Sequence, residues 1–467
     1  MKLNSKKISP YLIITVGLLL FRAFMNYAVP LMDKTEARYA EIARIMAETN
    51  NWITPQIDYG IPFWAKPPLS TWFSAISFDV FGVNEFAARF PYLLFSIFTI
   101  LLVGKYAKRK GLDFFIPGVI LLTLPEFLIH AGVVSTDTAL AFSVTLVMLS
   151  FWEGFYNKKH HFWKYLFFVG VGIGLLAKGP IIIILTGPPI FIWLLVSKEF
   201  KNLWKSFPWI VGVLLTALIA IPWYYLAEQK TPGFIDYFIV GEHFKRFLSS
   251  GWKGDKYGFP KSQPLGMIWI FLIAFAIPWI LILVKKLWQN KTILIKDKWI
   301  LFLVLWLLWT PLFFTVSKSL IHPYILPVMV PIALLITHWW NDILYRKKII
   351  IGSLVFPMLA LLFYIGLSVI DKNEYYINTD KYLIENTADS NIPIYHWENK
   401  SYSGRFYTKG NIETIEDATK LKKIMLLKEP FLLIIKHKNI KSIPKGEMLL
   451  LKRLDSNYKK EIYLFKE

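Results

Sequence analysis

The sequence of 467 residues contains no cysteine, few charged residues, no internal repeat and no low-complexity segment. The lack of cysteine excludes disulfides, cysteine-ligated metals and thiol nucleophiles. The sequence also has no glycine-rich loop of the kind that cradles a nucleotide's phosphates. Charged residues make up only 18% of the chain, whereas 55% are hydrophobic and 17% aromatic. This composition is typical of a protein that crosses a membrane many times.

Candidate membrane spans recur along most of the chain. A transmembrane helix needs roughly 17–25 mostly apolar residues. Several of the candidates are short or contain proline, so we expect about 11–13 transmembrane helices in an all-α bundle. The first span lacks a small-residue cleavage site, and we expect it to be retained. The eleven apolar stretches lie near residues 11–31, 88–104, 112–131, 136–152, 162–177, 180–197, 207–226, 264–284, 299–316, 321–340 and 349–370.

The formal net charge of +21 could indicate a nucleic-acid partner, but the distribution of the basic residues argues against one. They gather in alternate short connections, which is the pattern that the positive-inside rule predicts for a cytoplasmic N-terminus. An odd number of spans then places the C-terminus outside. We expect membrane lipids and no nucleic acid as partners of these loops. The basic segments are Lys2, Lys6, Lys7, 105–110, 157–164, 197–205, 285–298 and 345–348.

The chain divides into two predicted domains. Residues 1–370 form a transmembrane domain with outer loops at 32–87, 227–263 and 317–324. From residue 371 to 467 the sequence is mixed and polar, with short strand patterns at "IPIYHWE", "GRFYT", "FLLIIKH", "EMLLLKRL" and "EIYLFKE" and a helix pattern at "EDATKLKKIMLL". We therefore expect a small α/β domain outside the membrane.

The ionisable residues that the positive-inside rule does not explain fall on the outer side. Charges at membrane depth cost several kcal/mol unless they are paired or hydrated, so they are candidates for a functional site. Asp137 follows Ser135 and Thr136 at the outer end of a span. It could cap the helix that begins there, or face a substrate. Lys178 lies in "LLAKGPIII", which we interpret as a tight turn between two spans.

Cationic side chains in three outer segments are candidates for phosphate binding. Lys66 lies between an aromatic pair and a Pro-Pro step, and His243 and Arg246 share one face of a helix if "EHFKRF" is helical. Lys318 and Tyr324 lie in "SKSLIHPYILP". The alternatives are lysine side chains that reach to the lipid headgroups, a solvated loop helix and residues of an interfacial aromatic belt.

The segment "DKTEARYAEIARIM", residues 33–46, carries several charges directly after the first span. The spacing of its apolar residues predicts an amphipathic helix along the membrane interface. We expect Asp33, Glu36 and Arg38 to enter the site, Arg38 and Glu41 to pair or to orient the acids, and Lys34 and Arg44 to face headgroups. The alternative is a solvated charged face with no role in a site.

The segments "TEARYAEIARIMAETNNWITPQIDYGIPFWAKPPLSTWF", "STDTAL", "LLAKGP", "EHFKRF" and "SKSLIHPYILP" resemble the polyprenyl-phosphate-sugar-dependent membrane glycosyltransferases. This superfamily contains protein O-mannosyltransferases and the aminoarabinose transferases that modify lipid A. The resemblance implies an inverting transferase in the bacterial inner membrane, with its active site and C-terminal domain in the periplasm. It also implies a donor sugar linked to polyprenyl, usually undecaprenyl, phosphate. The acceptor would be lipid A, another envelope glycolipid or a protein hydroxyl.

Two positions depart from the aminoarabinose transferases. Thr35 stands where they have an aspartate three residues before the arginine that matches Arg38, and Ala65 replaces a glutamate associated with a bound metal. His243 matches the second residue of that metal site. The sequence therefore predicts no certain cofactor, and a divalent metal is left open.

The resemblance and the residue chemistry together suggest roles for the candidate residues. Asp33, Asp137 and Glu36 are predicted catalytic residues; Lys66, Arg246 and Lys318 are predicted to bind the donor phosphate; Arg38, His243 and Tyr324 are predicted to bind substrate. A polytopic lipid transporter or flippase is the alternative from another class. Such proteins often have repeated halves and charges near the midplane, whereas these charges gather on one side. The sequence does not identify the sugar or the acceptor.

Overall fold

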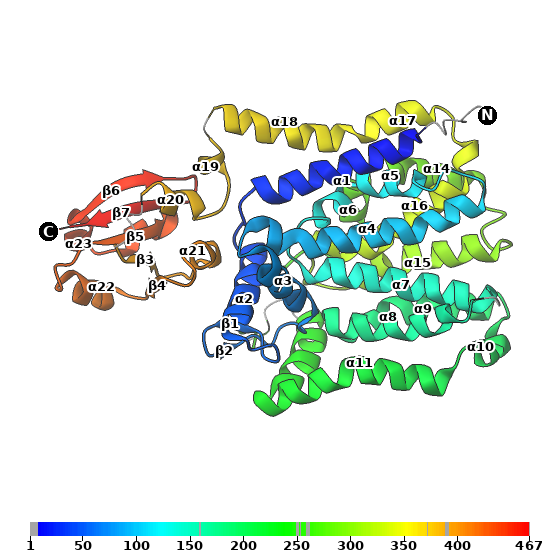
Figure 1. Ribbon diagram of the computed structural model, residues 1–467, viewed down its shortest axis with the longest axis horizontal. Helices are drawn as coiled ribbons and strands as arrows, with labels where there is room; N and C mark the ends of the chain where they lie inside the picture. The colour runs from blue at the N-terminus through cyan, green and yellow to red at the C-terminus, as the bar shows by residue number, and fades with distance from the viewer. Residues whose placement is uncertain are drawn as a thin grey trace, which may run out of the picture.

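The computed structural model describes residues 8–157, 160–248, 252, 254–257, 262–370, 372–387 and 392–466. A bundle of roughly parallel helices lies beside a smaller sheet domain, as Figure 1 shows. The basic residues Lys2, Lys6 and Lys7, part of the predicted basic loop 157–164 and part of the predicted outer loop 227–263 lie outside the described residues.

All eleven predicted apolar stretches are helical. Seven are single helices: α1 (Pro10–Ala28), α4 (Glu85–Arg109), α7 (Thr136–Tyr156), α8 (Phe162–Lys178), α9 (Ile181–Val196), α11 (Trp209–Lys230) and α15 (Lys298–Phe314). Four are broken into pairs: α5 (Ile116–Thr123) with α6 (Pro125–His130), α13 (Met267–Phe275) with α14 (Trp279–Gln289), η2 (His322–Val328) with α16 (Met329–His338), and α17 (Arg346–Ser353) with α18 (Val355–Val369).

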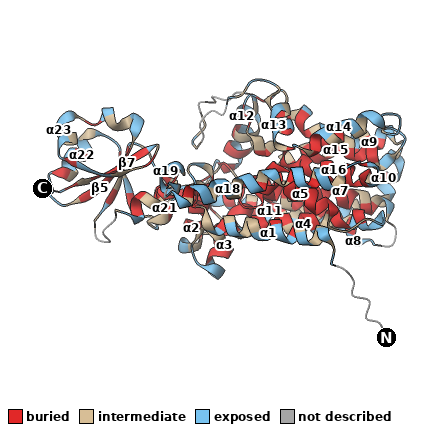
Figure 2. Ribbon diagram, turned by 90° about the horizontal axis from the view of Figure 1, so that it is seen from above, coloured by how far each residue is buried: buried red, intermediate tan, exposed pale blue. Residues whose placement is uncertain are grey.

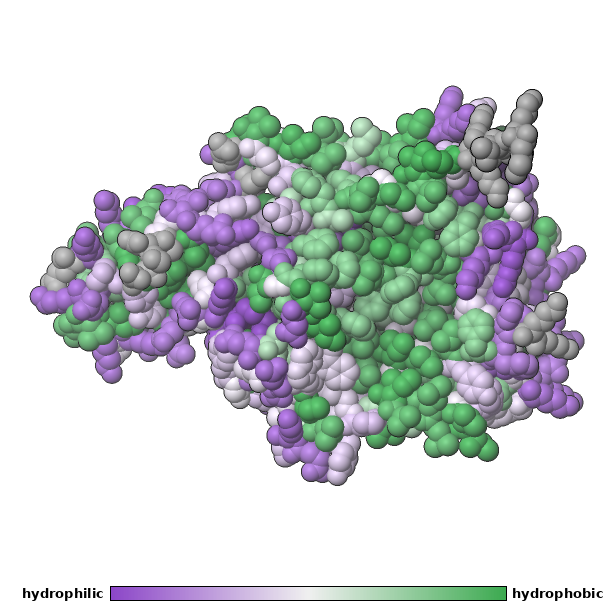
Figure 3. Space-filling model, in the orientation of Figure 1, coloured by the Kyte–Doolittle hydropathy of each residue, from purple (hydrophilic) through white to green (hydrophobic). Residues whose placement is uncertain are grey.

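Length and composition support a many-span membrane bundle. Among the described residues, five helices are long and apolar enough to cross a membrane, or six if the bent pair α13 and α14 is one span. The total of 11–13 spans stays a prediction. Figure 2 shows buried residues gathered inside the bundle, where Trp193, Trp279 and Trp306 are fully buried. Figure 3 shows an apolar surface over the bundle and polar surfaces at its two ends.

The outermost helices keep apolar side chains exposed. Leu218 on α11 is 72% exposed and Phe363 on α18 is 67% exposed. Such faces are suited to contact with lipid rather than water. The start of α1 and the helix α10 (Phe200–Ser206) lie at the end of the bundle opposite the sheet domain (Figure 1).

The first outer loop folds into α2 (Thr35–Thr49), β1 (Gln56–Asp58), β2 (Ile61–Pro62) and α3 (Leu69–Phe81). The helix α2 is buried on most of its faces, so it does not have the solvated charged face of the alternative interpretation. Its position along the membrane interface stays a prediction. Arg44 does not face headgroups: its Nε donates to Glu41 Oε2 at 2.7 Å, and its side chain is 3% exposed. The predicted pair of Arg38 and Glu41 is replaced by this buried pair.

The C-terminal residues form a five-stranded sheet in the order β4-β3-β5-β7-β6. Strand β3 is parallel to β4 and β5, whereas β7 is antiparallel to β5 and β6. Four strand patterns in the sequence match β3, β5, β6 and β7 at least in part, but "GRFYT" lies in the helix α21. The strands are β3 (Ile394–Trp397), β4 (Ile412–Ile415), β5 (Phe431–Lys436), β6 (Leu451–Ser456) and β7 (Lys460–Phe465), and the helices are α19 (Asn373–Tyr376), α20 (Lys381–Glu385), α21 (Tyr402–Tyr407), α22 (Ala418–Met425), η4 (His437–Ser442) and α23 (Lys445–Leu449).

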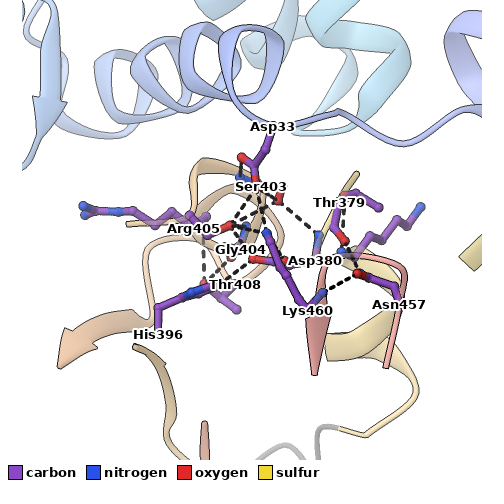
Figure 4. A network of polar contacts seen from close by, with 12 residues as sticks. Asp33, Thr379, Asp380, His396, Ser403, Gly404, Arg405, Thr408, Asn457 and Lys460 are labelled. Carbon is purple, nitrogen blue, oxygen red and sulfur yellow. Dashed lines mark hydrogen bonds and ion pairs between the residues drawn. The ribbon is translucent and has the colours of Figure 1, made fainter. Parts of the chain in front are cut away.

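A buried polar network holds the sheet domain against the start of α2 (Figure 4). Asp33 accepts hydrogen bonds from the backbone N–H of Ser403 at 2.9 Å and from its hydroxyl at 2.8 Å. Lys460 Nζ lies 3.0 Å from Asp33 Oδ2 and also pairs with Asp380. His396 Nε2 lies 2.7 Å from the other carboxylate oxygen of Asp380. Because these charges are buried and mutually paired, the network fixes the position of the sheet domain on the bundle.

Candidate active site

A cavity of about 360 Å³ opens where the bundle meets the sheet domain. Side chains from residues 34–66, from the start of α7 and the end of α8, and from the sheet domain are among those that line it. The charged lining residues are Lys34, Arg38, Lys66, Asp137, Lys178, Glu242, Arg246, Lys400 and Lys436. With seven basic and two acidic side chains, this cavity is suited to a negatively charged ligand.

Lys66 and Arg246 are brought together by Glu242. Lys66 Nζ lies 2.8 Å from Glu242 Oε2, and Arg246 Nη1 lies 3.0 Å from both oxygens of the same carboxylate. Pro67 and Pro68 fix the backbone after Lys66 just before α3 begins. Glu242 lies on the π-helix η1 (Asp236–Lys245), and Arg246 begins α12 (Arg246–Leu248). π-helical turns are rare and occur frequently at functional sites.

The charge of Glu242 follows from its two partners. Burial by itself raises the pKa of this carboxyl group, but Lys66 and Arg246 outweigh burial and hold the pKa below its ordinary value. Glu242 is therefore ionised at neutral pH. It fixes the two cations in place while leaving the group of three with a net charge of about +1.

Asp137 and Lys178 form a second ion pair in the cavity. Ser135 caps α7, because its hydroxyl oxygen accepts from the backbone N–H of Asp137 at 3.1 Å. The same hydroxyl donates to Asp137 Oδ2 at 2.9 Å. Lys178 ends α8, Gly179 turns the chain with a φ of 82°, and α9 begins at Ile181. The predicted tight turn is thus present, and the lysine side chain that precedes it lines the cavity.

Aromatic rings contact two of the cations of the site, Lys178 and Arg38. Lys178 Nζ lies 4.5 Å from the ring centroid of Tyr324, a residue that also lines the cavity. Arg38 lies over the ring of Tyr39 at 5.4 Å, and its Nη1 donates to the carbonyl oxygen of Tyr257 at 2.8 Å. These contacts keep the guanidinium and the ammonium groups in fixed positions at the cavity wall.

The residues at positions 65 and 243 do not fit the metal site that the resemblance implies. Ala65 offers no side-chain ligand. The ring nitrogens of His243 face the carbonyl oxygens of Phe238, at 2.8 Å, and Lys178, at 3.2 Å. A neutral imidazole donates through one of these nitrogens and keeps a lone pair on the other, so His243 offers one ligand at most, and one histidine does not make a metal site. His243 instead holds η1 against the end of α8, and burial lowers its pKa.

Three predicted site residues do not line the cavity: Asp33, Glu36 and Lys318. Asp33 lies in the interdomain network. Glu36 is buried and accepts from Arg89 Nε at 2.8 Å and Nη2 at 2.9 Å, which ties α2 to α4. Lys318 is exposed, although its neighbours on both sides line the cavity. Their predicted catalytic and phosphate-binding roles are therefore not carried into the proposal below.

The resemblance implies sugar transfer, and replacing Lys318 with alanine should change kcat/KM for that transfer by less than about threefold, because exposed charges outside a site contribute little. The measurement is transfer of labelled sugar by the full-length protein in detergent micelles. A loss as large as that caused by changing a cavity lysine would return Lys318 to the phosphate site.

Several cavity residues have no role predicted from the sequence. Glu242 stands four residues before Arg246, and this i,i+4 spacing of opposite charges was an available signal. Lys178 is one of the charges that the sequence makes functional candidates, but its segment is interpreted as a turn and no role is predicted for its side chain. Lys400, Tyr402 and Lys436 come from the sheet domain, where no motif distinguishes them from other polar residues.

Comparison with known proteins gives three kinds of match. The family described as Dolichyl-phosphate-mannose-protein mannosyltransferase matches residues 13–238. An undecaprenyl phosphate-alpha-4-amino-4-deoxy-L-arabinose arabinosyl transferase of Wigglesworthia glossinidia brevipalpis is 31% identical over 404 residues, which cover 80% of this chain and 68% of that protein. One from Pseudomonas fluorescens (strain Pf0-1) is 29% identical over 323 residues, or 66% of this chain and 55% of that protein. The chain thus spans about half to two thirds of the length of these relatives.

Solved structures agree with the fold. The crystal structure of ArnT from Cupriavidus metallidurans bound to undecaprenyl phosphate matches with a TM-score of 0.74 at 18% identity, over 97% of this chain and 98% of that one. The archaeal oligosaccharyltransferase AglB from Archaeoglobus fulgidus matches with a TM-score of 0.55 at 12% identity, over 95% of this chain and 72% of that one. This multi-pass membrane protein belongs to the polyprenyl-phosphate-sugar-dependent membrane glycosyltransferase superfamily, as its motifs indicate.

Proposed function

We propose that the protein is an inverting glycosyltransferase of the bacterial inner membrane. It transfers a sugar from a polyprenyl phosphate, such as undecaprenyl phosphate, to lipid A or another envelope glycolipid on the periplasmic face. The observation that carries the proposal is the pairing of two cations, Lys66 and Arg246, by one carboxylate in the same cavity as the Asp137–Lys178 pair.

The donor phosphate is placed at Lys66 and Arg246. During transfer the bond between the anomeric carbon and the phosphate oxygen breaks, and the electron pair leaves with the polyprenyl phosphate. Negative charge on that phosphate therefore grows toward the transition state. Cations already fixed beside it stabilise the transition state more than the ground state, which is what lowers the barrier.

The acceptor is placed on the side of Asp137 and Lys178. An acceptor hydroxyl attacks the anomeric carbon from the face opposite the leaving phosphate, so one direct displacement inverts that carbon. The proton of a hydroxyl passes to a base, and Asp137 is the carboxylate for this role because Glu242 is held by two cations. An acceptor phosphate is already ionised at neutral pH and needs no base; Lys178 would then orient it.

A protein hydroxyl is the second candidate acceptor. The specific observation in its favour is the match of residues 13–238 to the Dolichyl-phosphate-mannose-protein mannosyltransferase family. That matched part includes Lys66, Asp137 and Lys178 but ends before Glu242 and Arg246. The donor sugar is released in the same way whether the acceptor is a lipid or a protein hydroxyl. Only the identity of the glycosylated product distinguishes the two acceptors.

Lys400 and Lys436 of the sheet domain line the same cavity, and we assign them to the acceptor. Burial, with the neighbouring charges of Lys460 and Lys34, lowers the pKa of Lys436 to about 8. Lys436 is therefore charged below about pH 8 and neutral above it. Because the charged form attracts an anionic acceptor, KM for that acceptor should rise between pH 8 and about pH 9.5.

An arginine in place of Lys436 stays charged between pH 8 and about pH 9.5. KM of Lys436→Arg for the acceptor should therefore rise less over this pH range than KM of the wild type. The measurement is the pH dependence of KM at saturating donor, in the wild type and in Lys436→Arg. An identical rise in both proteins would show that Lys436 does not contact the acceptor.

The experiment that tests the function compares lipid A and total glycolipids by mass spectrometry in cells with and without the gene. Loss of a pentose- or hexosamine-sized mass from lipid A, restored by the wild-type chain and not by Lys66→Ala, would support the lipid acceptor. Unchanged lipids with a loss of glycan from envelope proteins would favour the second candidate. Unchanged lipids, glycoproteins and polysaccharides would contradict a transferase.

A further inference from the structure

A cluster of metal-binding residue types lies outside the cavity. Glu126 and His130 stand four residues apart on one face of α6, and His322 begins η2. One ligand atom from each lies within 4.8 Å of the other two. His130 Nδ1 lies 3.0 Å from Glu126 Oε1 and 3.0 Å from the backbone oxygen of Glu126, and His322 Nδ1 lies 2.9 Å from Glu126 Oε2.

The spacing of these atoms is close to that of zinc ligands. Zinc bonds to imidazole nitrogen and carboxylate oxygen are about 2.0–2.2 Å long, which places neighbouring ligands of a tetrahedron about 3.3 Å apart. The two distances from nitrogen to carboxylate oxygen are only a few tenths of an ångström shorter. Two histidines and one glutamate also make up a known zinc ligand set that leaves a fourth position for water. The His322 side chain is 38% exposed, so water can reach that position.

Electrostatics also favour a cation here. The Glu126 side chain is fully buried, and the ion-pair partners that the described residues give it are His130 and His322. A buried carboxylate is costly unless it is paired or bound to a metal. A divalent cation bound by these three side chains would balance that charge. Imidazole and carboxylate together suit zinc better than calcium or magnesium, which prefer all-oxygen sites.

We propose that Glu126, His130 and His322 bind one zinc ion that ties α6 to the start of η2. The neighbours of His322 on either side, Ile321 and Pro323, line the cavity, as does Tyr324. The ion would therefore lie behind the cavity wall and hold it in position rather than contact the sugar. This site differs in place and in ligands from the one implied for positions 65 and 243, and it does not depend on the proposed transfer reaction.

The test uses the full-length protein, purified in detergent micelles with a tag that lacks histidine. The protein is dialysed against EDTA, loaded with zinc, freed of excess metal and measured by elemental mass spectrometry. We expect about one zinc per chain in the wild type and less than about a tenth of that in His322→Asn or Glu126→Gln. His338→Asn on α16 is the matched control and should keep its zinc.

Two further measurements distinguish a variant that no longer binds zinc from a variant that no longer folds. Cobalt loaded in place of zinc should give the visible absorption of a tetrahedral site in the wild type and not in His322→Asn. Zinc should raise the unfolding temperature of the wild type and leave that of His322→Asn unchanged, since only a protein that binds the ion is stabilised by it. Wild-type protein without bound zinc, or equal zinc in the wild type and a well-folded His322→Asn, would overturn the proposal and leave a hydrogen-bonded cluster.

Discussion

Replacing Lys66 with alanine is expected to lower kcat/KM for sugar transfer about 10²–10³-fold, the usual effect of removing one group that stabilises charge in a transition state. The change removes a cation and leaves Glu242 with Arg246 alone. The net charge of the three groups then falls from about +1 to about zero, so the donor phosphate is held less tightly in the ground state and the leaving phosphate is stabilised less. Both a higher KM for the donor and a lower kcat follow. The measurement is transfer of labelled sugar from a polyprenyl-phosphate donor by purified full-length protein.

Glu242→Gln gives a contrasting result. The glutamine keeps the shape of the side chain but raises the net charge of the group to about +2, so binding of the donor phosphate is kept or tightened while the cations lose the carboxylate that positions them. We expect kcat to fall about tenfold with KM unchanged or lower. Lys230→Ala, an exposed lysine at the end of α11, is the matched control. If Lys66→Ala stays within about threefold of the wild type, or if Glu242→Gln raises KM as Lys66→Ala does, the phosphate does not bind here.

Much of the site could be predicted because its residues lie in local patterns. Lys66 precedes a Pro-Pro step, Asp137 lies at the start of a span, and Arg246 follows an aromatic-rich turn of outer loop. Each pattern fixes the local backbone and predicts the side of the membrane. Charges predicted at the outer ends of different spans are expected to lie near one another. Candidate residues of one site could therefore be named from the sequence before the packing of the helices was known.

Contacts between distant segments could not be predicted in this way. Asp33 stands beside the other charges of α2 in the sequence, yet its partners are Ser403 and Lys460, several hundred residues away. Glu36 likewise meets Arg89 on another helix. A carboxylate that completes a buried ion pair and one that faces a substrate have the same local sequence. Only the packing of α2 against α4 and the sheet domain separates the two.

The network around Lys460 should respond to mutation with a large loss of stability and little dependence on pH. Burial lowers the pKa of Lys460, but Asp380 and Asp33 outweigh burial and hold the pKa above its ordinary value. Burial raises the pKa of Asp380, but Lys460 and His396 outweigh burial and hold the pKa below its ordinary value. The raised lysine pKa stabilises the fold fully below about pH 10, and the lowered aspartate pKa does so above about pH 4. Docking of the sheet domain should therefore be constant from about pH 5 to 9.

Lys460→Met removes the cation and leaves Asp33 and Asp380 buried with less compensation. Breaking a buried ion pair on one side costs about 3–5 kcal/mol, so cleavage of the chain by protease between the bundle and the sheet domain should speed up about 10²-fold or more. Lys452→Met on the exposed side of β6 is the matched control. Adding Asp380→Asn to Lys460→Met should recover part of the loss, since the second change removes a charge that the first left unpaired. If the double variant is as unstable as the sum of the single variants, the loss comes from packing, and the network does not hold the domain through its charges.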